Sequence, residues 1–274
     1  RRMRLKGLLH PFQTMMTRLE GELVAVEGEH GGKHSPLEQF EIKPLVELNL
    51  FGYDVSFTNS SLMMLVALGL IVGFLTYAMR NRALIPDRLQ SVAEITYDYV
   101  ANIVKGVLGE DGMKYFPWVF SLFIFILTLN LLGMIPGNFT VTSHIIVTFA
   151  LAAMVWLTAT IIGFMKHGFG YLRLFVPAGV PWWLMPVIVP IELISYFIRP
   201  ISHSVRLFAN MMAGHTMLKV FAGFAVSLPW WGKIAPAGFM VAFTGLEFLV
   251  AFLQALVFTL LTCIYLNDAV NMHH

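Results

Sequence analysis

The sequence predicts an all-α protein that crosses a membrane several times. Hydrophobic residues make up 57% of the 274 positions, while charged residues make up 12%, about half the share that is usual in soluble domains. Several apolar segments are also long enough to cross the hydrocarbon core of a bilayer as helices, which takes roughly 20 residues each. The fold class we expect is therefore an all-α polytopic membrane protein with about five transmembrane helices.

The N-terminal part of the chain, residues 1–55, is polar and has no sustained apolar period. We expect it to form an external arm, followed by a single membrane domain over 56–274. The first span is predicted at 57–79, a segment without any charged residue. Residues 86–113 place apolar side chains at helical spacing among charged ones, a pattern typical of an amphipathic helix on the membrane surface.

The second and third spans are predicted at 115–137 and 142–164, and the connection between them is short and uncharged. The last two apolar segments, 190–228 and 236–266, are too long for a simple crossing. At about 1.5 Å per residue they would measure roughly 60 Å and 45 Å, against a hydrocarbon core of about 30 Å. We therefore expect a long, tilted C-terminal helical hairpin.

Basic residues in the connections predict the orientation of the chain. They gather in the 80–114 and 166–180 connections, whereas the 138–141 and 229–235 connections carry Lys233 alone. Because short cytoplasmic loops are rich in lysine and arginine, the first pair of connections should be cytoplasmic. Five crossings then leave the N-terminus outside and the C-terminus inside.

Composition and charge argue against several other classes of protein. The net charge of +2 is too small to indicate a nucleic-acid partner. Cys263 is the single cysteine, so the chain can form neither an internal disulfide nor a cysteine-based metal site, and we expect it to be a small buried residue. His30 and His34 lie in a glycine-bearing arm, where histidines are more often solvated than bound to metal. We therefore expect no metal ion and no cofactor.

Arg206, inside the apolar stretch 201–215, is the strongest functional signal in the sequence. A cation at the centre of a bilayer costs about 2.5 to 3.5 kcal/mol on insertion scales, so a function is the default explanation. At about 100° per residue, Ser202 and Asn210 share a helical face with Arg206, while His215 points to the opposite side. One face would carry the cation, and the other a titratable imidazole.

Three more polar residues accompany this pattern. Glu192 returns to nearly the face of Arg206, roughly 21 Å closer to the expected cytoplasmic end. Glu247 and Gln254 share one face of the last predicted helix, two turns apart. These residues also have structural interpretations. Arg206 could form an ion pair with Glu192 or Glu247, although Glu192 is distant along the same helix. His215 and Glu247 could simply pair across the hairpin, and Gln254 could form a hydrogen bond between helices.

The remaining histidines near the spans suggest a different class, a haem-binding membrane cytochrome. His203 and His215 are twelve residues and about 120° apart on one helix, which is a poor geometry for two ligands of a haem stack. His144 lies at the start of a predicted helix, where we expect a capping or interfacial role. An independent secondary transporter or ion channel is the main alternative, although the repeats that many transporters carry are not evident in this sequence.

The segment from Arg206-Leu-Phe-Ala to Asn210, then Ala213-Gly-His215, with Glu247 and Gln254 downstream, resembles subunit a of the F-type ATP synthase. The resemblance covers most of residues 45–268. The order of His215 and Glu247 is that of the mitochondrial and related bacterial members. One departure concerns the second span, where some bacterial members carry an aspartate three residues after an asparagine; this chain has Gly133 after Asn130.

The resemblance implies a membrane stator subunit that provides two proton half-channels to a rotating c-ring and couples proton flow to ATP synthesis. Such a subunit translocates protons and does not itself bind ATP. The implied partners are the c-subunit ring, subunit b of the peripheral stalk, the catalytic sector, the lipid membrane and the transported protons. The implied location is the inner (plasma) membrane of a bacterium, with the mitochondrial inner membrane as the alternative.

The same resemblance assigns roles to residues. Arg206 would be the partner of the c-ring carboxylate, with Asn210 one turn further on. His215 and Glu247 would be a coupled channel pair, and Gln254 the polar residue opposite the arginine. The inner half-channel would contain Ser202 and Glu192.

Overall fold

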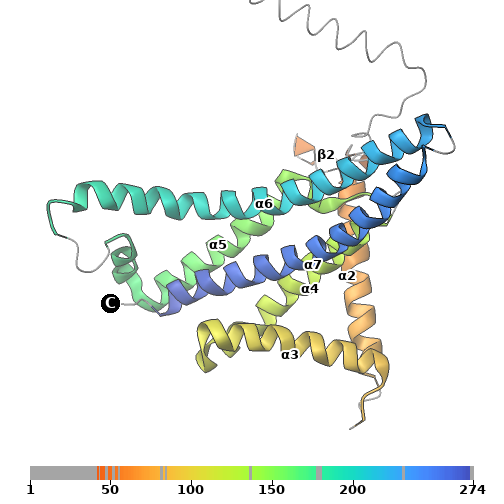
Figure 1. Ribbon diagram of the computed structural model, residues 1–274. Coiled ribbons are helices and arrows are strands. Elements are labelled where there is room, and N and C mark those ends of the chain that lie inside the picture. Colours follow the sequence, from red (N-terminus) through yellow and green to blue (C-terminus); the bar gives the residue numbers. More distant parts are fainter. Residues whose placement is uncertain are drawn as a thin grey trace, which may run out of the picture. The chain divides into compact units, whose positions relative to one another are not determined.

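The computed structural model describes residues 42, 44–46, 49–50, 53–54, 56–80, 83, 85–135, 138–176, 181–229 and 232–271. Within this part of the chain, five helices are long and apolar enough to span a membrane, which confirms the predicted fold class. Figure 1 shows how they are arranged. Most of the predicted external arm, including His30 and His34, lies outside the described residues.

Two short antiparallel strand pairs precede the first span. Strand β1 (Pro44–Val46) pairs with β4 (Phe57–Thr58), and β2 (Asn49–Leu50) pairs with β3 (Tyr53–Asp54). The sequence analysis did not predict these strands, because strands of two or three residues are too short to show a period of two.

Helix α2 (Asn59–Ala78) is the first span, and it starts two residues later than the predicted position 57. The reason is Thr58, which has an extended backbone and caps the helix by accepting a hydrogen bond from the Ser61 amide at 3.4 Å. Many of the apolar side chains of α2 are exposed, among them Leu65, Leu68 and Val72. This surface suits contact with lipid.

Helix α3 (Arg88–Leu108) is the predicted amphipathic helix. The side chain of Asp87 caps its first turn by accepting from the Arg88 amide at 2.7 Å. The helix ends at Gly109, whose φ of 73° lies in the left-handed region that glycine occupies without steric strain. Its buried side chains, including Val100 and Val104, pack against α4 and α7.

Helices α4 (Phe116–Gly133) and α5 (Ile145–His167) are the second and third spans. A single 3-10 turn, η3 (Val141–Ser143), lies between them and packs against α4, α5 and α6. Two further 3-10 segments flank this pair, η2 (Glu110–Tyr115) before α4 and η4 (Gly168–Phe175) after α5.

Helices α6 (Met185–Ser227) and α7 (Ile234–Val270) form the long hairpin, with 43 and 37 residues. In Figure 1 both run crosswise to α2. Helix α6 begins before the predicted position 190 because Pro186 falls in its first turn, where the missing N–H of proline has no helical partner to lose. The helix also continues through Pro200, so this proline does not end it.

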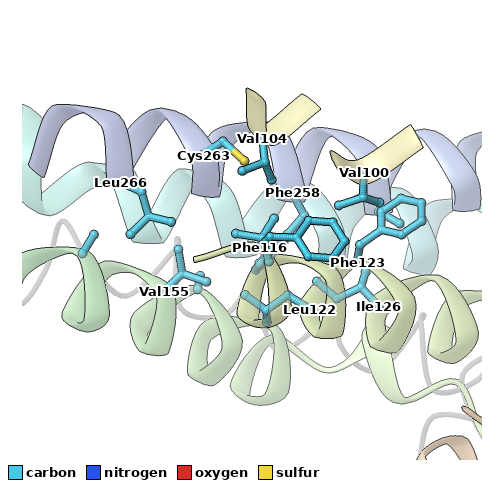
Figure 2. Packing of buried hydrophobic residues seen from close by; sticks show 14 of the residues in the cluster. Val100, Val104, Phe116, Leu122, Phe123, Ile126, Val155, Phe258, Cys263 and Leu266 are labelled. Carbon is cyan, nitrogen blue, oxygen red and sulfur yellow. The ribbon is translucent and has the colours of Figure 1, made fainter. Parts of the chain in front are cut away.

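The largest buried cluster joins the long hairpin to the shorter helices. Figure 2 shows its packing, with side chains from α3, α4, α5 and α7 in contact: Val100, Val104, Phe116, Leu122, Phe123, Ile126, Val155, Phe258, Cys263 and Leu266. The Cys263 thiol is free and fully buried, which confirms its interpretation as a small buried residue.

Hydrogen bonds add to this packing and fix the position of α7 along its axis relative to α4 and α5. The Asn130 amide on α4 donates to the Ala251 carbonyl oxygen at 3.1 Å, and the Lys166 ammonium on α5 donates to the Val270 carbonyl oxygen at 3.0 Å. Because the middle and the C-terminal end of α7 are held in this way, the position of Glu247, one turn before Ala251, is fixed along the hairpin.

Candidate functional site

Arg206 lies on an exposed face of α6. Its side chain makes no ion pair or hydrogen bond with the residues that the structure describes. Ser202, one turn earlier, is exposed, and Asn210, one turn later, is half-buried. The interpretation of Arg206 as part of an ion pair with Glu192 or Glu247 is therefore wrong, since both carboxyl groups have other neighbours.

His215 and Glu247 meet across the hairpin. His215 Nδ1 on α6 lies 3.3 Å from Glu247 Oε1 on α7, and the two residues are only 8% and 6% exposed. Gly214 makes this approach possible, because a Cβ atom at its position would lie 2.8 Å from Glu247 Oε1. The structure thus brings together the two titratable residues that the sequence singled out.

Thr140 completes the surroundings of His215, and the sequence analysis missed it. Its Oγ1 lies 3.3 Å from His215 Nε2 and also 3.3 Å from the Gly133 carbonyl oxygen. A Cβ atom at Gly133 would lie 2.7 Å from the Thr140 methyl carbon, so glycine leaves the room that Thr140 occupies. Thr140 therefore packs against Gly133, the position in the second span that lacks the aspartate found in some bacterial members of the resembled family.

A cavity of about 210 Å³ between α6 and α7 connects two of the predicted site residues. Asn210 and Glu247 both line it, together with Ala213, Gly214, Met217, Phe243, Leu246 and Val250. Since a water molecule occupies about 30 Å³ in the liquid, this space is large enough for several. Gln254 is half-buried elsewhere on α7 and makes no hydrogen bond with the described residues.

A second polar group lies on the other side of Arg206 along the hairpin. The Arg199 guanidinium is 2.9 Å from Asp268 Oδ2 and 3.8 Å from Glu192 Oε1. It also lies near the rings of Tyr196 and Tyr265, at 5.8 and 5.7 Å from the ring centroids. Glu192 therefore belongs to an ion cluster with Arg199 and Asp268, and it makes no ion pair with Arg206.

The sequence analysis did not identify Arg199 and Asp268. Arg199 did have a signal: it lies seven residues after Glu192 and seven before Arg206, which puts all three on one helical stripe. Asp268 had none of this kind. However, a charged side chain near the end of a predicted span can extend to the membrane surface. The spacing alone therefore did not identify Arg199 as part of an ion pair inside the protein.

The other two histidines differ in their surroundings. His203 is 2% exposed, its ring lies 3.8 Å from that of Phe258, and neither ring nitrogen has a hydrogen-bond partner among the described residues. His144 is the N-cap residue of α5, but its side chain makes no capping hydrogen bond, so it is not a side-chain cap, and the interfacial role stays a prediction. Its ring instead stacks on Phe139 at 4.9 Å, and partial burial lowers its pKa.

Comparison with known proteins yields a consistent set of relatives. The model of the family described as ATP synthase A chain matches residues 61–267. The ATP synthase subunit a of Rhodospirillum rubrum is 56% identical over 240 residues, which cover 88% of this chain and 100% of that protein. Those of Parvibaculum lavamentivorans and Maricaulis maris are 56% and 53% identical, cover 87% and 88% of this chain, and are themselves covered to 94% and 98%.

Proposed function

The chain belongs to the ATP synthase subunit a family, and from this premise we propose that Arg206 faces the proton-carrying carboxylates of the c-subunit ring. The protein is a multi-pass membrane subunit of an F-type ATP synthase and works in a complex with other synthase subunits. It serves as a stator in the membrane sector and takes part in proton transport and ATP synthesis.

One observation carries the proposal for Arg206: its cationic side chain is exposed on an apolar helix and has no anion among the described residues. A cation at membrane depth is stable only with compensation, and we infer that a neighbouring subunit supplies the anion. A guanidinium within about 4–6 Å favours the ionised form of a carboxylate. Each ring carboxylate that reaches Arg206 would therefore release its proton.

Arg206 also acts as a barrier to protons in this proposal. A guanidinium is effectively always protonated in proteins, so it cannot accept a proton from one side and release it on the other. Protons must then travel around on the rotating ring, and this detour couples their flow to rotation.

The two half-channels lie on either side of Arg206. For the outer one we assign His215, Glu247 and Asn210, a choice supported by the 3.3 Å contact and by the shared cavity of Asn210 and Glu247. We assign Gln254 as the polar residue of the pathway that lies opposite Arg206. For the inner one we assign Ser202 and Glu192, supported by the exposure of Ser202 and by the ion cluster of Glu192 with Arg199.

The wider assembly follows from the same family membership. We assign as partners the c-ring, subunit b of the peripheral stalk and, through the complex, the catalytic sector. The location we propose is the inner membrane of a bacterium, with the N-terminus outside and the C-terminus in the cytoplasm. This choice rests on the basic 80–114 and 166–180 connections and on the bacterial sources of the relatives.

The test compares Arg206→Ala with Arg173→Ala, which removes an exposed cation from η4 instead. Both complexes are reconstituted into vesicles, and ATP-driven proton pumping is measured per assembled complex. We expect Arg206→Ala to abolish pumping and Arg173→Ala to retain it. Normal pumping by the Arg206→Ala complex would refute the proposed role.

A further inference from the structure

The position of Thr140 determines how its hydroxyl group can form hydrogen bonds. Oγ1 lies 3.3 Å from the Gly133 carbonyl oxygen and 3.3 Å from His215 Nε2. A hydroxyl has one hydrogen to donate and two lone pairs that can accept, whereas a carbonyl oxygen can only accept. The Thr140 hydrogen therefore goes to Gly133, and an oxygen lone pair remains for an N–H group at His215 Nε2.

We propose that Thr140 is a positioning residue that keeps a hydrogen on Nε2 of His215, so that Nδ1 alone exchanges protons with Glu247. A neutral imidazole carries one N–H, and the hydrogen bond made by one nitrogen determines which nitrogen holds it. The inference rests on the proposed function of His215 and Glu247 in the outer half-channel, and it adds a residue to that pathway.

The resulting step involves one proton and two atoms. With hydrogen on Nε2, Nδ1 is unprotonated and lies 3.3 Å from Glu247 Oε1. The two atoms are in contact without the alignment of a hydrogen bond, so the carboxyl group turns toward Nδ1 for the transfer. A protonated Glu247 carboxyl can give up its proton: the O–H bond breaks, an N–H bond forms at Nδ1, and a carboxylate and an imidazolium result. The reverse step restores both groups, and the Nε2 hydrogen stays in place throughout. The other tautomer would present an N–H to the protonated carboxyl and block the transfer.

The surroundings of Thr140 hold this arrangement firmly. The residue is 1% exposed, and the Ser143 hydroxyl donates to the Thr140 carbonyl oxygen at 2.6 Å, which closes the turn that contains η3. The Thr140 methyl group packs against Gly133 in the space that the missing side chain leaves. A fixed hydroxyl selects one tautomer, whereas a mobile water molecule could donate to or accept from either nitrogen.

The experiment uses the whole reconstituted complex with three variants. Thr140→Val removes the hydroxyl and keeps the branched shape, while Thr140→Ser restores a hydroxyl. Thr142→Val is the matched control, because Thr142 is fully buried in the same turn and its hydroxyl has no partner among the described residues. Proton pumping is measured per complex, and the tautomer of His215 is read by nitrogen-15 solid-state NMR, with the signal identified by its loss in His215→Asn.

We expect Thr140→Val to lower pumping at least fivefold and to add the Nδ1–H tautomer to the NMR signal. Thr140→Ser and Thr142→Val should stay within twofold of the unmodified complex and keep the Nε2–H tautomer. The inference is overturned if Thr140→Val keeps both tautomer and pumping, or if it lowers only the amount of assembled complex. Normal pumping by His215→Asn would instead refute the proposed outer half-channel itself, so the two failures are distinguishable.

Discussion

At the scale of single residues, Gly214 leaves the space that the Glu247 carboxyl group occupies. A Cβ atom there would lie 2.8 Å from Glu247 Oε1, so Gly214→Ala must displace the carboxyl group from its place beside His215. Because the displaced atoms form the end of a flexible side chain, we expect the complex to assemble normally and proton pumping to fall several-fold.

The control for this prediction is Gly223→Ala on the same helix, where an added Cβ meets nothing within 4 Å. Both substitutions add one methyl group and raise helix propensity by a similar amount, about 1 kcal/mol per residue. Pumping should therefore stay normal in Gly223→Ala. Equal pumping by the two variants would contradict the close packing of Gly214 against Glu247.

The sequence alone predicted some of these residues and not others. Arg206 stood out because a charge inside an apolar span is rare, and His215 and Glu247 stood out for the same reason. Thr140 gave no such signal, since it is an uncharged residue in the short predicted connection 138–141. Its contact with His215 joins positions 75 residues apart, which no local pattern shows.

At the scale of helices, the ion pair between Arg199 and Asp268 links α6 to the end of α7. The atoms are 2.9 Å apart and both side chains are about two-thirds buried, so the pair should contribute more than an exposed one. We expect Asp268→Asn to lower the melting temperature of the detergent-solubilised complex by a few degrees.

Glu110→Gln is the matched control, since it also removes one carboxylate charge. Glu110 pairs with Lys105 at 3.4 Å, but its side chain is 83% exposed, and exposed pairs contribute about 0–1 kcal/mol. The melting temperature should therefore not change measurably. An equal effect of the two substitutions would contradict the view that Arg199 and Asp268 hold the hairpin together.

The number, order and type of the spanning helices followed from hydrophobic length, which is a strong local signal. The ends were harder to predict, because caps and prolines decide them: Thr58 delays the start of α2, and Pro186 allows α6 to start early. The 3-10 turn η3 was not predicted, yet Thr140, the residue just before it, contacts His215.

At the scale of the whole molecule, the hairpin arranges its polar groups in order. Along α6, Arg199 precedes Arg206 by seven residues and His215 follows it by nine, which is roughly 10 Å and 14 Å of helix. The antiparallel α7 contributes Asp268 at the first position and Glu247 at the second. Two polar regions thus flank an arginine that cannot give up its proton, as two separate half-channels require.

We expect these two regions to open to opposite sides of the membrane, and cysteine labelling can measure this. Ser202→Cys and Glu247→Cys are made separately in the complex, where the native Cys263 is fully buried and serves as the unreactive background. A membrane-impermeant thiol reagent is then added to either face of sealed vesicles. We expect Ser202→Cys to react only from the cytoplasmic face and Glu247→Cys only from the outer face. Labelling of both from the same face would contradict this expectation.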